Sequence, residues 1–219
     1  MKLQRAILAS AILIGASAAV GVWAFSRLPP QALIAVHFNA HGDPDGYLAK
    51  GLGLILTPAI GAGVILLLAL LFRVAPQRRN LAASAGAYGV VMVGVAAIFL
   101  VTQGSLVARA MDPAFDVLRS VFIAIGILLA VVGNILGKIR HNYVLGVRTP
   151  WTLANERVWD KTHRFTGRLM LLAGAALAAG AALAPGHRLM IALLIVCAAA
   201  PPIAGAIYSW RVYRAIGRA

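Results

Sequence analysis

Six long stretches of apolar residues constrain this chain more than any other feature of its sequence. They cover residues 6–25, 52–72, 81–101, 114–136, 169–183 and 189–210. An α-helix needs roughly 20 such residues to cross about 30 Å of hydrocarbon, and only the fifth stretch is clearly shorter. None has a charged residue at its centre, as a helix surrounded by lipid requires. The sequence therefore predicts an all-α integral membrane protein, a bundle of six transmembrane helices.

The composition of the chain agrees with this prediction. Hydrophobic residues make up 61% of its 219 residues, and charged residues only 12%. A soluble domain carries about 25% charged residues. Because a water-soluble protein of this size could not bury so much apolar surface, the soluble, disordered and collagen-like classes are excluded.

The first apolar stretch has a second interpretation, a cleaved secretory leader. Lys2 and Arg5 form a positively charged start, and Ala16-Ser17-Ala18 resembles a cleavage site. However, the apolar run continues through Val20 to Phe25, which exceeds an ordinary leader and ends in aromatic residues suited to a membrane interface. We favour a retained membrane helix, and the leader stays the alternative.

The positive charges predict an orientation. The chain has 20 Lys and Arg against six Asp and Glu, a net charge of +14. Fifteen of the 20 fall on the side that holds both termini, and five fall on the other: Arg27, Lys50, Arg109, Arg119 and Arg188. The fifteen are Lys2, Arg5, Arg73, Arg78, Arg79, Lys138, Arg140, Arg148, Arg157, Lys161, Arg164, Arg168, Arg211, Arg214 and Arg218. Since cytoplasmic loops carry the excess of Lys and Arg, both termini are expected in the cytoplasm (N-in, C-in), and direct nucleic-acid binding is not needed to explain the charge.

A polar segment of residues 26–51 lies between the first two spans, on the predicted outer side. Residues 33–38 fit a short extended segment, and the Asn, Gly, Asp and Pro that follow specify tight turns. We predict that this loop faces a ligand, with the residues His37, Asn39, Asp43, Asp45, Tyr47 and Lys50. A metal site of His37, His41, Asp43 and Asp45 is the alternative, but the spacing matches no known ligand pattern. No metal and no cofactor is expected.

A second polar segment, residues 138–168, lies on the predicted cytoplasmic side. Thr149-Pro150 suits a helix start, Thr152 is a rival N-cap, and the helix could end at Gly167 or run straight into the fifth span. Arg157, Lys161, Arg164 and Arg168 then form one basic stripe. Asp160 and Arg164 are spaced as an ion pair within a helix. The sequence predicts an amphipathic cytoplasmic helix between spans four and five, lying on the anionic inner leaflet.

This basic helix allows three interpretations. It is a lipid anchor, or a docking surface for a cytoplasmic partner, or part of an enzyme in which His163 works with Asp160 or Glu156 as acid and base. No nucleophile motif or phosphate loop accompanies these residues, so the chain is not expected to be an enzyme. Cys197 is the single cysteine, which excludes an internal disulfide.

Both polar segments resemble those of a known family. Residues Gly133-Asn134, Asn142, Gly146, Arg148-Thr149-Pro150-Trp151-Thr152-Leu153, Trp159, Thr162-His163-Arg164 and Gly167 resemble the signature of the SdpI family of bacterial immunity proteins. The run from His37-Phe38-Asn39 through Pro44-Asp45-Gly46-Tyr47 to Lys50 resembles a small N-terminal domain often fused to that module. The resemblance divides the chain into residues 1–80, an N-terminal membrane module, and residues 81–219, the SdpI-like module.

The resemblance implies a function. Members of that family protect the producing cell against a secreted peptide toxin, and they are similar to receptors that hold a cytoplasmic transcriptional repressor at the membrane. The expected partners are thus the lipid bilayer, a peptide toxin outside and a repressor inside, in a multi-pass protein of the bacterial inner membrane. The residues expected at the cytoplasmic docking site are Asn134, Asn142, Arg148, Trp151, Arg157, Trp159, Lys161, His163, Arg164 and Arg168. The alternative is a small-molecule or lipid transporter that uses Asn134, Arg148 and His163 at the inner ends of spans four and five.

Overall fold

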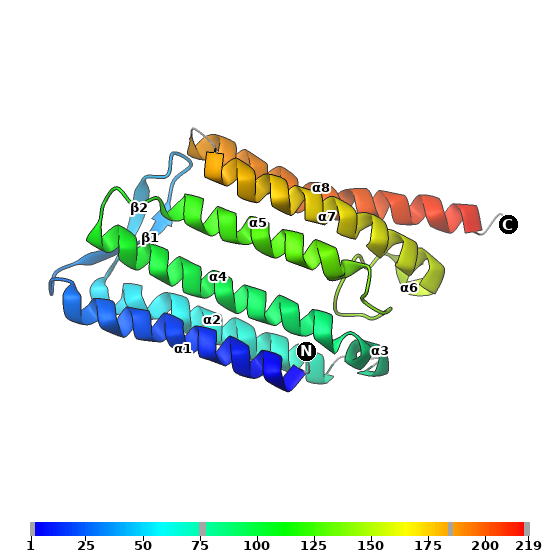
Figure 1. Ribbon diagram of the computed structural model, residues 1–219, viewed down its shortest axis with the longest axis horizontal. Coiled ribbons are helices and arrows are strands. Elements are labelled where there is room, and N and C mark those ends of the chain that lie inside the picture. Colours follow the sequence, from blue (N-terminus) through cyan, green and yellow to red (C-terminus); the bar gives the residue numbers. More distant parts are fainter. Residues whose placement is uncertain (1–2, 75–77, 184–185, 217–219) are drawn as a thin grey trace.

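Six long helices run along the length of the molecule, and a small β-hairpin lies at one end (Figure 1). The computed structural model describes residues 3–74, 78–183 and 186–216. The long helices are α1 (Leu3–Arg27), α2 (Lys50–Val74), α4 (Ala85–Met111), α5 (Val117–Leu136), α7 (Glu156–Leu183) and α8 (His187–Ile216). Shorter elements are α3 (Arg78–Ala83), α6 (Pro150–Ala154), β1 (Leu33–Phe38) and β2 (Pro44–Ala49).

The prediction of six membrane spans is confirmed. All six long helices are long and apolar enough to cross a membrane. Their bounds differ from the apolar stretches where polar residues join a helix. The third span ends at Met111 instead of residue 101, because Gln103 and Arg109 find partners inside the bundle: Gln103 donates to the Leu54 carbonyl at 3.0 Å and Arg109 to the Phe115 carbonyl at 3.2 Å.

Helix α7 settles the course of the second polar segment. Of the two predicted courses, the chain takes the one that runs straight into the fifth span, since α7 is uninterrupted from Glu156 to Leu183. The predicted amphipathic helix is therefore the first half of α7 and not a separate helix lying on the leaflet. Val158, Trp159, Thr162, His163, Thr166 and Gly167 are all buried, so this half of α7 packs inside the bundle as the second half does.

Pro58 interrupts the hydrogen-bond ladder of α2 without ending the helix. Proline has no N–H to donate to the carbonyl of Leu54, four residues earlier. The side-chain amide of Gln103 donates to that carbonyl instead. A neighbouring helix thus satisfies the carbonyl that this proline leaves without a partner, as is required in a membrane, where no water replaces the bond.

Glycines bring α5 and α7 into backbone contact. A Cβ on Gly126 would lie 2.5 Å from the Ala178 nitrogen, and one on Gly167 would lie 2.6 Å from the Gly133 carbonyl oxygen. Gly133 and Gly174 are equally tight, against the backbone at Leu171 and Ala130. Small residues allow such close approach where the hydrophobic effect does not hold helices together. The small-residue face of the fourth span therefore packs within one bundle.

The outer polar segment forms the two-stranded hairpin. β1 and β2 pair antiparallel, with Ile34 opposite Leu48 and Ala35 opposite Tyr47. Ile34 is fully buried against Gly53 of α2, which leaves the polar residues of both strands on the other face. The predicted extended segment at 33–38 is confirmed as β1.

The two sets of positive charges lie at opposite ends of the bundle. The five residues assigned outside lie at the end that carries the hairpin, and the described members of the other set lie at the opposite end (Figure 1). Lys2 and Arg218 fall outside the described residues. We call these ends the outer end and the inner end; which side of the membrane each faces stays a prediction.

Candidate functional site

The inner end is built around a folded segment, residues 138–155, that packs against α4, α7 and α8. Its first part turns on Asn142, which is fully buried. The Asn142 side chain donates to the Arg140 carbonyl at 2.7 Å and accepts the backbone N–H groups of Val144 and Leu145, each at 2.8 Å. Asn142 therefore shapes the segment and does not face a partner.

His163 connects this segment to α7. The backbone N–H of Val147 donates to His163 Nε2 at 3.0 Å, so the ring proton is on Nδ1, which donates to the Trp159 carbonyl at 2.8 Å. The rings of His163 and Trp159 are stacked 3.9 Å apart, and the Trp159 indole donates to the Ile139 carbonyl at 2.8 Å. Both side chains are fully buried.

His163 is buried, and both of its ring nitrogens are bonded to backbone groups, so neither is free to exchange a proton with a substrate. Asp160 and Glu156 are exposed on α7, whereas His163 is enclosed. The alternative acid–base combination of His163 with Asp160 or Glu156 is therefore not assembled. The described ion pairs involve Asp45 and Asp116, and none joins Asp160 to Arg164, so that predicted pair is not formed either.

Gly146, in the folded segment, has a positive φ, a backbone conformation that glycine adopts more easily than other residues. Its φ is +109°, and a Cβ at this position would overlap His163 Nε2. The signature glycine thus lets the chain pass directly over the buried imidazole.

The short helix α6 fastens the segment to α8. Thr149 and Thr152 form a reciprocal capping box around Pro150, the first helical residue, which confirms Thr149 as the N-cap. Thr149 Oγ1 lies 3.2 Å from the Ser209 hydroxyl of α8, and the Trp151 indole donates to the same hydroxyl. The signature residues Thr149, Trp151 and Thr152 hold α6 against α8.

The positively charged residues of the predicted docking site do reach the surface. Arg148, Arg157, Lys161, Arg164 and Arg168 are exposed. Asn134 is exposed too, and with Arg164 and Arg168 it lines a notch of about 200 Å³ between α5 and α7. Arg148 lies apart from them, lining a second cavity of about 520 Å³ between α4, α5, α7 and α8. Of the ten predicted residues, Asn142, Trp159 and His163 are buried and Trp151 is half-buried, whereas Asn134 and the five basic residues are exposed.

At the outer end, the hairpin presents part of the predicted ligand-facing set. His37 and Asp45 lie 2.5 Å apart on the exposed face, near Asp43 and Tyr47, which are exposed as well. Asn39 accepts the N–H groups of His41 and Asp43 at 2.8 and 3.1 Å and so forms the turn.

Lys50 was predicted to face a ligand with the other residues of the outer loop, but the structure places it in the interior. Its ammonium group is buried, donating to the carbonyls of Phe25 and Leu28 at 3.1 Å and lying over the Phe25 ring. A cation favours the C-terminus of a helix, where carbonyls are unpaired, so Lys50 caps α1 and does not face outward.

A second outer cluster joins the hairpin to α5 and α8, and sequence reasoning missed it. Asp116 caps α5, accepts from Arg119 N and Nε, and pairs with His187 Nε2 at 3.0 Å. Arg119 also donates to the Ala181 and Ala182 carbonyls at the end of α7, and Arg188 pairs with His41 of the hairpin turn. A Cβ on Gly42, whose φ is +87°, would overlap the His187 ring. The contact of Asp116 with His187 could not be predicted from the sequence, because the two residues are 71 positions apart.

The environment of Asp116 favours its charged form. Partial burial alone would raise the pKa of Asp116, but the hydrogen bonds from the Arg119 backbone, from His187 and from the Arg119 guanidinium outweigh it and hold the pKa below its usual value. Asp116 therefore stays an anion that joins the start of α5 to the start of α8.

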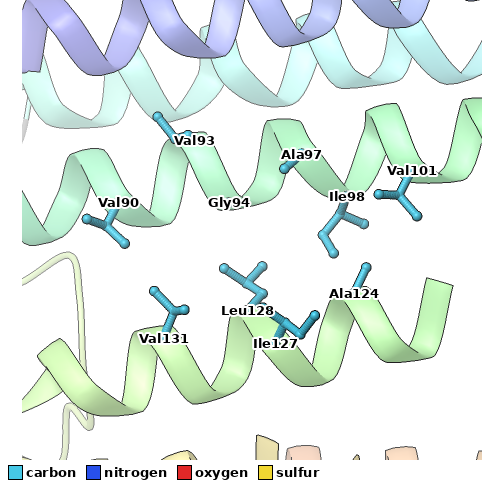
Figure 2. A pocket seen from close by; sticks show the side chains of 10 residues that line it. All are labelled: Val90, Val93, Gly94, Ala97, Ile98, Val101, Ala124, Ile127, Leu128 and Val131. Atoms are coloured by element: carbon cyan, nitrogen blue, oxygen red, sulfur yellow. The ribbon is translucent and has the colours of Figure 1, made fainter. Parts of the chain in front are cut away.

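The described residues offer no group of three or more His, Cys, Asp and Glu side chains that could hold a metal ion. A separate groove of about 410 Å³ lies between α4 and α5, and Figure 2 shows that only hydrocarbon side chains line it. Nothing at that groove could orient a polar ligand.

Comparisons with known proteins found two family models that match separate parts of the chain. Residues 138–207 match the model of the SdpI/YfhL protein family, and residues 12–62 match a domain of unknown function, DUF1648. The chain is 30% identical over 74 residues to the immunity protein SdpI of Bacillus subtilis (strain 168); the match covers 34% of this chain and 36% of that protein. No solved structure matches the chain. Residues 138–207 of this multi-pass protein of the bacterial inner membrane are thus similar to the SdpI/YfhL family.

Proposed function

We propose that this chain is an SdpI-like immunity protein that protects its cell against a secreted peptide toxin. The similar protein from Bacillus subtilis is named an immunity protein. The family match covers all of α6 and α7 and much of α8, the elements that the inner signature residues hold together. The division into modules of residues 1–80 and 81–219 is part of the same proposal.

The observation that carries the proposal is that α8 contacts both polar regions. Its first residues, His187 and Arg188, meet the turn of the outer hairpin. Near its other end, Ser209 accepts from Trp151 of the inner segment. A ligand that changes the position of the hairpin would therefore act on a helix that also holds the inner signature. Such coupling requires that the ligand and the inner partner prefer the same arrangement of the bundle.

The outer ligand surface in this proposal is the exposed face of the hairpin. His37, Asp43, Asp45 and Tyr47 supply hydrogen-bonding groups and one aromatic ring there. Such a mixture suits a peptide, which presents backbone amides together with apolar side chains.

The inner partner surface is the basic stripe of α7. Arg157, Lys161, Arg164 and Arg168 are exposed on one helix, and the described ion pairs include none of them. This surface complements an acidic protein, in keeping with a cytoplasmic repressor that is captured at the membrane.

Deletion of the gene tests immunity. The deletion strain and its parent are exposed to a panel of secreted antimicrobial peptides, and the inhibitory concentrations are compared. We expect the deletion strain to be more sensitive to at least one peptide, with wild-type sensitivity restored by the gene in trans. Unchanged sensitivity to every peptide would contradict the proposal.

Charge reversal tests the docking surface separately. Arg157→Glu with Arg164→Glu should abolish capture of a candidate repressor on membranes without loss of membrane insertion. Arg211→Glu with Arg214→Glu, at the exposed end of α8, makes the same charge change elsewhere and should leave capture intact. If the Arg157→Glu, Arg164→Glu protein captured the repressor as well as the wild type does, the proposed docking surface would be contradicted.

The transporter alternative has less support. His163 is enclosed, and Asn134 and Arg148 line different cavities. The three residues on which a transport site was expected to depend thus do not converge on one path.

A further inference from the structure

The cavity of about 520 Å³ at the inner end has features that neither immunity nor repressor binding explains. Its volume is within the range of roughly 300–1,000 Å³ that is usual for ligand pockets. Its wall comes from four long helices and the folded segment, including Val91 of α4, Val132 of α5, Met170 of α7 and Ala198 of α8. Ala198 and Arg148 are exposed lining residues, so the cavity is open to the surroundings of the bundle.

The polar lining is confined to one end of this cavity. Arg148 and Thr149 of the folded segment lie at the inner end, and Thr166 of α7 contacts Gly205 near them. From Ala206 to Ala198 the wall extends along α8 for about 12 Å toward the membrane centre, at 1.5 Å per residue, and this deeper part is apolar. A ligand that fits both parts has a polar head and a hydrocarbon tail.

Arg148 is the polar group at the inner end of the cavity that has bonding capacity left over. It donates Nη1 to the Tyr143 carbonyl at 2.8 Å, and no described acidic residue forms an ion pair with it. The Thr166 hydroxyl is packed against Gly205 of α8 and does not face the cavity. The remaining guanidinium donors of Arg148 are therefore available to an anionic ligand.

From this arrangement we infer that the cavity is a binding site for one anionic phospholipid of the adjoining leaflet. The phosphate lies at Arg148, because a guanidinium provides paired donors that match phosphate oxygens. One acyl chain fills the apolar part between Val91, Val132 and Ala198. Cavities between membrane helices that carry basic residues at the cytoplasmic side are suited to anionic headgroups.

The full-length chain, purified in mild detergent, provides the test. Native mass spectrometry measures binding of phosphatidylglycerol and of phosphatidylcholine with the same acyl chains. We expect phosphatidylglycerol to bind about tenfold more tightly. Both lipids carry the phosphate that meets Arg148, but phosphatidylcholine also carries a quaternary ammonium, which the Arg148 guanidinium repels. Equal affinities for the two lipids would overturn the inference.

Two variants with matched controls locate the site. Arg148→Gln should lower phosphatidylglycerol affinity about tenfold, whereas Arg157→Gln, an exposed arginine outside the cavity, should not. Ala198→Phe fills the apolar part without touching the folded segment and should weaken both lipids, while Ala200→Phe on the same helix should weaken neither. Undiminished binding by Ala198→Phe would place the lipid elsewhere and contradict the site.

Discussion

Single residues decide whether the inner segment can fold over α7, and Gly146 is the clearest example. Its backbone adopts φ +109°, and His163 lies where a side chain would project. We predict that Gly146→Ala costs about 2–4 kcal/mol, because it combines an unfavourable backbone conformation with a steric clash. Thermal unfolding in mild detergent should show a markedly lower midpoint.

Gly104→Ala provides the control for that substitution. Gly104 lies in α4, and a Cβ there meets nothing within 4 Å. The control should unfold at or above the wild-type midpoint, since alanine favours a helix over glycine. If both variants unfolded alike, the passage over His163 would not be the reason for the signature glycine.

Asp116 gives the outer end a dependence on pH. Its pKa is lower in the folded protein than an unfolded aspartate's, so the unfolded state binds more protons as the pH falls below about 4. The stability that Asp116 contributes is present above that pH and is lost below it. We predict that Asp116→Asn lowers the unfolding midpoint at pH 6 and reduces the further fall between pH 5 and pH 3.

An exposed carboxylate serves for comparison in that titration. Asp43→Asn, on the hairpin turn, should keep both the wild-type midpoint at pH 6 and the wild-type acid sensitivity. If the unfolding midpoint of the Asp116→Asn protein fell between pH 5 and pH 3 as much as that of the wild type, groups other than Asp116 would cause the acid sensitivity.

The signature residues were predictable as a set, but their individual roles were not. His163 and Asn142 were expected on a docking surface, and both are buried because they bond backbone groups of Val147, Val144 and Leu145. Which backbone groups approach a side chain depends on how residues 138–155 fold back, and no periodicity encodes that. The arginines of that set are exposed, since charge alone keeps unpaired guanidinium groups at the surface; their docking role stays a prediction.

At the scale of elements, the contact between α5 and α7 should be the least tolerant of added volume. Gly126, Gly133, Gly167 and Gly174 bring the two backbones together. We predict that Gly174→Leu destabilises the bundle by about 3 kcal/mol or more, because the neighbouring backbone at Ala130 cannot move aside. The midpoint of unfolding in detergent is the measurement.

Gly63→Leu tests whether that effect is specific to the contact. Gly63 lies in α2, and an added Cβ meets nothing within 4 Å. This variant should unfold close to the wild type. Equal losses in both would mean that leucine is unfavourable at any glycine of the bundle, and the α5–α7 contact would lose its special role.

Helices were the part of the fold that the sequence predicted best. The length of the apolar stretches alone identified six spans, because a helix needs about 20 apolar residues to cross the hydrocarbon core. It misjudged the start of α7, since Trp159, Thr162 and His163 are polar or aromatic yet buried through hydrogen bonds and packing. Helix α4 likewise continues beyond its apolar stretch because a buried polar residue is hydrogen-bonded there. Gln103 donates to the Leu54 carbonyl, which Pro58 leaves without a backbone partner.

At the scale of the whole molecule, the charge asymmetry makes a prediction about orientation. The hairpin end should face outward and the end with residues 138–168 should face the cytoplasm. Reporter fusions at Asp43 and at Lys161 should therefore report opposite sides, with the fusion at Lys161 cytoplasmic. Both reporters on one side, or the reverse assignment, would overturn the orientation.

The central claim also concerns the whole molecule: we propose that protection against a peptide toxin depends on the contact between the outer hairpin and α8. Gly42 lies against His187, so Gly42→Val should displace the hairpin, whereas Gly63→Val should not. The two variants and the wild type are expressed at equal membrane levels in a sensitive strain, and the inhibitory concentration of the peptide is measured.

We predict that the wild type and Gly63→Val raise that concentration, and that Gly42→Val leaves it near the value of cells without the protein. Equal protection by Gly42→Val, or no protection by the wild type against any peptide tested, would contradict the account.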